Sequence, residues 1–350
     1  MLLSVSFVPQ TRAETVTLPY PLQDVTSFFD GTNVYMVGGF TLGMVLDSIL
    51  SYNPSTGKIV QESAVLKSVV RSATSFWDGK SAYIFGGLAY NDSDPLDDLI
   101  VFTPPGNVQT FRHFLPYGMK GNSIAWTGKY AYLFGNCITK SSCGKKNIVM
   151  FEPKTMNIAV LNISLPLDVA GTSTVWTGKD IYLFGGMTTS GPTDMIIKFN
   201  PATGNITVMK SKLPFARYHT GAVLYGGKAI IFGGQIKNQS YVDQVVIYNT
   251  TSGKVTVSEM KLPYPLATRS YVLIKNEVFL CGGSTKSGPM TSIEIFSAQE
   301  AISTAATSQT QKIDWQSVFT VSAAVGILAV LTVVELVLAF QRRQRTGRKT

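Results

Sequence analysis

The chain has 350 residues, 45% of them hydrophobic and 15% charged, so it is long and apolar enough to bury a large core. Its formal net charge is +9 at pH 7. Five of these charges lie within the last ten residues, which leaves +4 for the first 340. This distribution excludes a general polyanion-binding surface and therefore argues against nucleic acid as a partner.

The N-terminal segment, residues 1–13, is MLLSVSFVPQTRA. It contains a short apolar stretch and a small residue, Ala13, at a position where a signal peptidase would cut. No basic residue precedes the apolar stretch, and that stretch is at the short limit for a signal peptide. Two interpretations stay open: a weak or truncated signal peptide, and no signal at all.

From residue 14 onward the sequence repeats six times, with spacings of 48, 49, 50, 48 and 49 residues. Each copy carries a leucine, called here the marker leucine, and 21 residues later the second position of a glycine pair. This offset never varies, so every insertion falls after the glycine pair. The marker leucines are Leu18, Leu66, Leu115, Leu165, Leu213 and Leu262, and the second glycine positions are Gly39, Gly87, Asn136, Gly186, Gly234 and Gly283.

Between the marker leucine and the glycine pair, each copy has two short apolar runs around a turn such as DGT, DGK or TGK, a pattern that predicts a β-hairpin. A third run (DDLIVF, DMIIKF) and a fourth (NITVM, KVTVS) follow, separated by turns such as NPSTG. Six four-stranded units predict an all-β, six-bladed β-propeller. Trp77, Trp126 and Trp176 share a position that holds Phe or Leu in the other copies, so we expect them in the core.

The glycine pairs come where an inner strand ends. Glycine tolerates the dihedral angles and the close backbone approach that such a position requires. A phosphate-binding loop is the competing interpretation, but no helix follows and no lysine stands where a P-loop would need it. The sequence therefore favours a structural role for the pairs.

The repeated hydrophobic-Tyr-hydrophobic-Phe-Gly-Gly hairpin, as in "AYIFGG", and the "YNPSTG" segment resemble the Kelch repeat family over residues 14–298. The copies lack the tryptophan that follows the third strand in that family. The resemblance implies a six-bladed Kelch-type propeller whose blade loops bind partners. The sixth copy, residues 269–296, has only three strands, and the segment ETVTL at residues 14–18 matches its missing fourth strand. We expect these first and last strands to pair and seal the ring, because an open ring would expose two sheet edges.

Three segments follow the propeller. Residues 299–317, rich in Ser, Thr, Ala and Gln, predict a flexible or O-glycosylated stalk. Residues 318–340 are 23 mostly apolar residues that as a helix would span about 34 Å, enough to cross a bilayer. The basic tail at residues 341–350 is predicted to be cytosolic, which places the propeller in the lumen or outside the cell. Without a signal peptide, the alternative is a tail-anchored protein with a cytosolic propeller.

Two further sets of residues concern the compartment. Five Asn-x-Ser/Thr triplets are candidate N-glycosylation sites, and Cys137 and Cys143 are close enough in sequence to form a small disulfide in an oxidising compartment. Cys281 stands where other copies have Val or Phe and is expected to be a buried apolar residue. The five triplets begin at Asn91, Asn162, Asn205, Asn238 and Asn249.

Four cations lie 14–17 residues before the second glycine of their copies: Arg71, Lys120, Arg217 and Arg269. In Kelch modules an arginine at the start of the inner strand faces the top of the channel, so the resemblance implies a partial basic ring for an acidic partner. The alternative is that each cation satisfies carbonyl groups between blades. The variable loops after the glycine pairs are the second candidate binding surface.

Catalysis finds little support in the sequence. Galactose oxidase, the enzyme that the resemblance brings into comparison, needs two histidines and two tyrosines on copper, whereas this chain has only His113 and His219, in different layers of the predicted blades. We therefore expect no cofactor and no metal. The predicted function is non-catalytic recognition of a protein or glycan partner by a single-pass membrane protein; the alternatives are a tail-anchored cytosolic scaffold and a lumenal enzyme.

Overall fold

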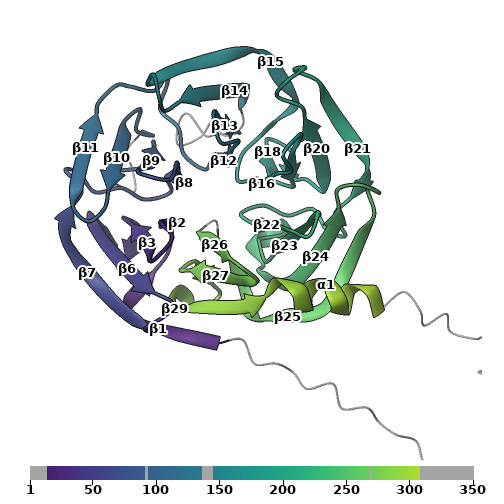
Figure 1. Cartoon of the computed structure of the whole chain (residues 1–350). Helices are drawn as coiled ribbons and strands as arrows, with labels where there is room; N and C mark the ends of the chain where they lie inside the picture. The colour runs from purple at the N-terminus through teal and green to yellow at the C-terminus, as the bar shows by residue number, and fades with distance from the viewer. Residues whose placement is uncertain (1–13, 91–93, 136–144, 269, 308–350) are drawn as a thin grey trace, which may run out of the picture. The chain divides into compact units, whose positions relative to one another are not determined.

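The computed structural model of the protein describes residues 14–90, 94–135, 145–268 and 270–307. The chain divides into two units after Ala306, and the fold below is that of the first unit. It is an all-β propeller: antiparallel sheets stand in a ring around a central space, with the first strand of each repeat innermost (Figure 1).

Four of the sheets have four strands each, and a larger sheet has nine strands. Two small hairpins, β4 (Phe40–Thr41) with β5 (Met44–Val45) and β18 (Met187–Thr188) with β19 (Gly191–Pro192), lie in loops that follow the glycine pairs. The four-stranded sheets are β2 (Thr26–Phe29), β3 (Val34–Val37), β6 (Ser48–Asn53), β7 (Lys58–Val65); β8 (Thr74–Trp77), β9 (Ala82–Phe85), β10 (Leu99–Thr103), β11 (Asn107–Phe111); β12 (Ser123–Trp126), β13 (Ala131–Phe134), β14 (Lys145–Glu152), β15 (Asn157–Val169); and β16 (Ser173–Trp176), β17 (Ile181–Phe184), β20 (Met195–Phe199), β21 (Ile206–Lys212).

The nine-stranded sheet contains two runs of four strands, β22–β25 and β26–β27–β29–β1, which the short strand β28 joins by pairing with β25 and β29. Its strands are β22 (Gly221–Tyr225), β23 (Lys228–Phe232), β24 (Val242–Asn249), β25 (Val255–Ala267), β26 (Tyr271–Ile274), β27 (Glu277–Cys281), β28 (Ser284–Thr285), β29 (Gly288–Ser297) and β1 (Glu14–Leu22).

The predicted hairpins are present in all six repeats. In the second repeat, β8 and β9 pair from Thr74 opposite Phe85 to Trp77 opposite Ala82. The DGK turn between them closes because the Asp78 carboxylate accepts hydrogen bonds from the backbone N–H groups of Lys80 and Ser81, each at 2.8 Å. The turn chemistry read from the sequence therefore sets the register of the inner strands.

Each glycine pair joins one repeat to the next. The backbone N–H of the second glycine donates a hydrogen bond of 2.7–2.9 Å to the carbonyl oxygen of the residue four positions after the next marker leucine. We call this contact the glycine joint. Five joints lie within the described residues: Gly39 to Val70, Gly87 to Met119, Gly186 to Arg217, Gly234 to Leu266, and Gly283 to Leu22.

The first glycine of each pair has no room for a side chain. A Cβ atom on Gly86 would lie 2.1 Å from the carbonyl oxygen of Met119 in the next repeat, and the same approach recurs at 2.1–2.7 Å in every repeat. Real Cβ atoms do not come so close to an oxygen, so only glycine fits. The expectation that the glycine pairs serve close backbone approach is confirmed.

The hydrophobic core lies between adjacent sheets as six clusters. One cluster packs Phe28 and Tyr35 of the first repeat against Ile84 and Phe102 of the second. Trp77 stacks on Phe28 at the edge of this cluster, with ring centroids 5.3 Å apart. Each sheet thus buries both faces against its neighbours, and the six marker leucines, all no more than 5% exposed, contribute to the clusters.

The ring closes as predicted. Strand β1 pairs antiparallel with β29, from Glu14 opposite Ile295 to Thr17 opposite Ser292. The glycine joint from Gly283 to Leu22 adds a second contact between the last repeat and the first, and one core cluster contains side chains from both. The N-terminal strand therefore contributes main-chain bonds and buried surface to the closure.

The first part of the predicted stalk is a helix. Residues Ala298–Thr307 form helix α1 instead of a flexible spacer, so the prediction for this part of 299–317 is wrong. Ala298, Ala301, Ile302 and Ala305 are at most 9% exposed and complete the core cluster between the fifth and sixth repeats, because their spacing places them on one helix face. The Thr304 hydroxyl also lies 2.6 Å from that of Ser258 on β25, beside which α1 runs (Figure 1).

Of the predicted terminal segments, residues 1–13, the rest of the stalk (308–317), 318–340 and 341–350 lie outside the described residues. The helices in the described part of the chain do not include one with the length and hydrophobicity needed to cross a membrane. The membrane helix stays a prediction from the sequence.

Substituting Gly86 with alanine should destabilise the ring by about 3 kcal/mol or more, because the new Cβ collides with the Met119 carbonyl. Gly79→Ala is the matched control: Gly79 has φ +104° but nothing within 4 Å of the added Cβ, so it tests backbone strain alone and should cost about 1–2 kcal/mol. Denaturant unfolding of both variants measures the difference. Equal losses would mean that the glycine joint does not constrain the ring.

Candidate functional site

A belt of main-chain hydrogen bonds runs around the ring axis at the position six residues after each marker leucine. In five repeats this residue is left-handed, with φ between +52° and +68°. The backbone N–H of Ser72 donates to the carbonyl of Asp24 at 2.7 Å, and the same bond recurs to His219. The belt consists of Asp24, Ser72, Gly121, Gly171 and His219, with successive bonds of 2.7, 3.4, 2.7 and 2.8 Å.

The belt stops at the sixth repeat. Thr268 holds the equivalent position but is not among the left-handed residues in the described part of the chain. Its hydroxyl instead accepts a 3.0 Å hydrogen bond from the backbone N–H of Ser270. Asp24 and His219 therefore lie at the two ends of the belt, on either side of Thr268. Both adopt the left-handed conformation, which costs a residue with a side chain about 1 kcal/mol.

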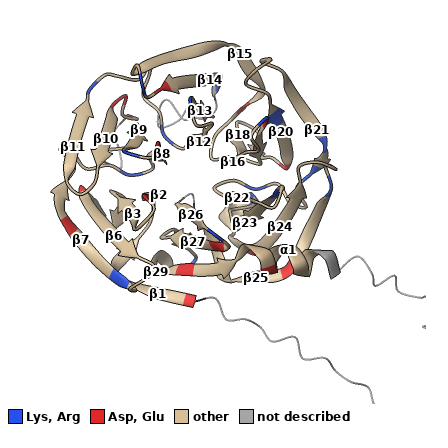
Figure 2. Ribbon diagram, viewed as in Figure 1, with Lys and Arg blue, Asp and Glu red and all other residues tan. Residues whose placement is uncertain are grey.

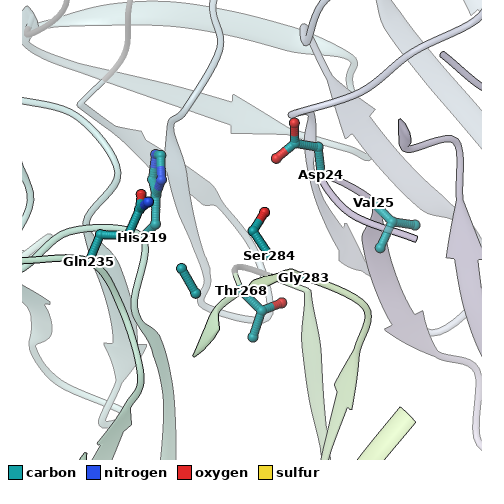
Figure 3. A pocket seen from close by; sticks show the side chains of 8 residues that line it. Asp24, Val25, His219, Gln235, Thr268, Gly283 and Ser284 are labelled. Atoms are coloured by element: carbon teal, nitrogen blue, oxygen red, sulfur yellow. The ribbon is translucent and has the colours of Figure 1, made fainter. Parts of the chain in front are cut away.

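A small polar cavity lies at this gap. Its volume is about 40 Å³, and its polar lining comes from Asp24, His219, Gln235, Thr268 and Ser284. Figure 3 shows the Asp24 carboxylate, the Ser284 hydroxyl and the His219 ring around one space. At about 10–15 Å³ per water, the cavity has room for a few water molecules and not for a peptide or a sugar.

The four cations of the predicted basic ring do not behave alike. The Arg71 guanidinium lies 3.4 Å from the Asp24 carboxylate and 4.9 Å from the centre of the Phe40 ring, so its charge is already matched. Lys120 is half-buried, and Arg269 lies outside the described residues. Basic and acidic residues are scattered over the ribbon (Figure 2).

The prediction for Arg217 is wrong. This side chain is fully buried, and it donates hydrogen bonds to the Gly233 carbonyl oxygen, at 3.4 Å, and to the Gln244 side chain. Its own carbonyl receives the glycine joint from Gly186. Burial lowers the pKa of Arg217 to about 10, which leaves it charged at neutral pH. The Arg217 side chain therefore satisfies groups within the fifth repeat, while its main-chain carbonyl joins this repeat to the fourth.

A much larger concavity lies on the loop side of the fifth and sixth repeats. We call it the loop groove; its volume is about 1100 Å³. Its lining comes from the loop of residues 238–241, the hairpin of residues 284–290 and parts of β25, β29 and β1. Its lining residues are Thr15, Asn238, Gln239, Ser240, Tyr241, Pro263, Tyr264, Pro265, Thr285, Lys286, Ser287, Pro289, Met290, Thr291, Ser292 and Glu294.

The most unusual group in the loop groove is the Glu294 carboxylate, because the residue is only 2% exposed. It accepts hydrogen bonds from Tyr264 at 2.7 Å, Ser292 at 2.5 Å and Thr15 at 3.0 Å. Burial and the neighbouring carboxylate raise the pKa of Tyr264 to about 12. These bonds tie the two ends of the propeller, β1 and β29, to β25.

The histidines are separate. The His113 ring lies 3.0 Å from Asp97 on the exposed surface, and this hydrogen bond raises its pKa, whereas His219 lines the axial cavity. Within the described ranges, no three His, Cys, Asp or Glu residues are grouped as metal ligands. The axial cavity offers polar groups for holding water, and the loop groove offers mixed aromatic, proline and hydroxyl surface, which suits binding.

The candidate modification sites fall in several places. Asn162 on β15, Asn205 before β21 and Asn238 in the short helix η1 (Lys237–Gln239) are exposed. The Asn249 side chain accepts hydrogen bonds from the backbone N–H groups of the two following positions, 251 and 252. Asn91, Cys137 and Cys143 lie outside the described residues. Cys281 is fully buried as expected, and burial raises its thiol pKa to about 12.

Comparison with known proteins gives the class of this propeller. A family model, the KLHDC2/KLHL20/DRC7 Kelch-repeats domain, matches residues 121–325, which is more than half of the chain. The protein is therefore a Kelch-repeat β-propeller. It belongs to the family that this Kelch-repeats domain defines. A search of the curated proteins finds no match.

Replacing Arg217 with alanine should lower the free energy of unfolding by about 3–5 kcal/mol, because it leaves a cavity and strips the Gly233 carbonyl and Gln244 of their donor. Arg71→Ala is the control. Its ion pair with Asp24 is partly exposed, with side chains 16% and 32% accessible, so the loss should be about 1 kcal/mol. Urea unfolding distinguishes them; an Arg217→Ala variant as stable as Arg71→Ala would restore Arg217 as a candidate ligand-binding cation.

Proposed function

We propose that this protein is a non-catalytic recognition module that binds an extended segment of a partner protein in the loop groove. The observation that carries the proposal is the contrast between the two concavities. The axial cavity, about 40 Å³, is too small for a ligand, whereas the loop groove, about 1100 Å³, is in the size range of sites that bury several side chains.

The composition of the groove supports a protein ligand. Tyr241 and Tyr264 offer aromatic surface and Pro263, Pro265 and Pro289 offer rigid apolar surface, while hydroxyl groups line the remainder. Such rigid side chains lose little conformational entropy when a partner binds. Loops on a rigid scaffold are also where repeat proteins place their binding surfaces. A glycan is the second candidate ligand from the sequence, and no feature of the groove favours it.

We also propose six blades. The two runs of four strands within the nine-stranded sheet support this number, as do the six core clusters between neighbouring repeats. Each run has the strand order of a separate four-stranded sheet, and β28 is the bridge between them.

We further propose that residues 318–340 cross a membrane once, with the propeller in the lumen or outside the cell. The apolar length of this segment and the basic residues after it support the proposal. The exposed positions of Asn162, Asn205 and Asn238 leave these asparagines accessible to glycosylation. We propose no catalytic activity, metal or cofactor, because His113 lies on the exposed surface and His219 lines the axial cavity, whereas a copper site like that of galactose oxidase needs two histidines together.

A photo-crosslinking amino acid placed at Ser287, on the rim of the loop groove, should form a covalent adduct with a partner protein in cells that express the full chain. The matched control carries the same amino acid at Ser55, an exposed residue in the turn between β6 and β7, at the opposite ends of the strands. Adduct formation is followed by immunoblotting. Adducts from Ser55 and none from Ser287 would place the binding surface elsewhere and contradict the proposed groove.

Enzymatic removal of N-glycans should lower the apparent mass of the full-length protein, and the propeller should resist protease in intact microsomes. Asn162→Gln and Asn205→Gln should each remove part of the mass shift, since both residues are exposed and neither lines the groove. An unshifted protein whose propeller is cleaved in intact microsomes would contradict the lumenal location and establish a cytosolic one.

A further inference from the structure

In the described part of the chain, the Glu294 carboxylate is bonded by neutral groups. Its three hydrogen-bond donors within the described residues are hydroxyls: Tyr264 from β25, Ser292 from β29 and Thr15 from β1. Hydroxyls stabilise a buried carboxylate but do not neutralise its charge. Oε1 accepts two of the bonds and Oε2 accepts one, so Oε2 keeps the capacity for a further donor.

Other acids of the propeller are paired differently. Asp24, Asp98, Asp194 and Asp243 each lie 3.3–3.7 Å from an arginine or lysine side chain. The ion pairs found among the described residues do not include Glu294, although it is more deeply buried than Asp24. Among the described residues, the buried Glu294 carboxylate therefore has no arginine or lysine paired with it, and it lines the loop groove.

The surroundings of this charge suit a long basic side chain. Among the described residues that line the groove, the other charged one is Lys286, which is exposed in the turn between β28 and β29. The rings of Tyr264 and Tyr241, both partly exposed, provide apolar surface for the methylene groups of lysine or arginine. An aromatic face also attracts the cation itself.

We propose that the loop groove recognises a partner segment that carries a lysine or arginine, whose cationic end is directed to the Glu294 carboxylate. This rests on the proposed function and names its ligand class. It also reverses the sequence-based expectation of an acidic ligand, because Arg71 is paired with Asp24 and Arg217 is buried. The partner's basic side chain supplies the missing counter-charge, and its backbone lies between the loop of residues 238–241 and the hairpin of residues 284–290.

The probe is a phage-displayed library of random peptides, selected on the purified full-length protein in detergent. Selected peptides should share a Lys or Arg at one position. Glu294→Gln keeps the side-chain shape and removes the charge, and it should weaken a selected peptide about tenfold. Glu259→Gln is the matched control: it makes the same change at an exposed residue of β25 that does not line the groove, and it should leave the affinity unchanged.

A second measurement does not depend on how well the Glu294→Gln variant folds. Replacing the shared Lys of the peptide with norleucine, which keeps the methylene chain, should weaken binding to the unaltered protein about tenfold. The affinity of the lysine peptide should also fall as salt is added, whereas that of the norleucine peptide should not.

The outcomes separate this inference from the proposed function. Groove-binding peptides without a shared basic residue, or with equal affinity for Glu294→Gln and the unaltered protein, would overturn the ligand class and leave the groove as the binding site. Peptides that still bind when Ser287 is replaced by a bulky tryptophan in the groove would contradict the groove itself, and with it both proposals.

Discussion

A single main-chain hydrogen bond, repeated around the ring, organises this propeller. The second glycine of each pair donates its N–H to a carbonyl of the next repeat, as Gly87 does to Met119, while the first glycine lets the two backbones approach. Because this bond joins one repeat to the next, it holds neighbouring sheets at a constant distance, and the hydrophobic cluster between them fills that space. The joint from Gly283 to Leu22 applies the same geometry where the chain ends meet.

The glycine joint also positions the loops that follow the inner strands. The inner strands end at the joints, and the chain then enters the loops, so every loop starts from a fixed point. In the fifth and sixth repeats these loops line the loop groove together with the buried Glu294. Around the ring axis, the belt of main-chain bonds that runs from Asp24 to His219 joins five repeats. A rigid ring that carries a groove between its loops is consistent with a protein-binding module.

Sequence patterns predicted the features that repeat, because six copies report the same local chemistry. The hairpins, the marker leucines and the pairing of β1 with β29 were all accessible in this way. Features unique to one repeat were not. Arg217 and Arg71 lie at nearly the same distance in sequence before the second glycine of their repeats. Only the folded structure shows that Arg217 is buried and that Arg71 forms a partly exposed ion pair with Asp24. Helix α1 was missed because its small residues suggested a spacer, although the spacing of Ala298, Ala301 and Ala305 follows one helix face. Glu294 lies among residues from both chain ends, and no local signal brings these together.

Hydrogen exchange of the joint amides tests the central claim, that identical joints make the ring one closed structure. The account predicts that the amides of Gly39, Gly186 and Gly283 exchange at similarly slow rates, because opening any joint requires breaking the ring. An open array of repeats would fray from its ends. Much faster exchange of the Gly283 amide than of the Gly186 amide would contradict the account, since it would show that the last repeat and β1 part while the remaining repeats stay folded.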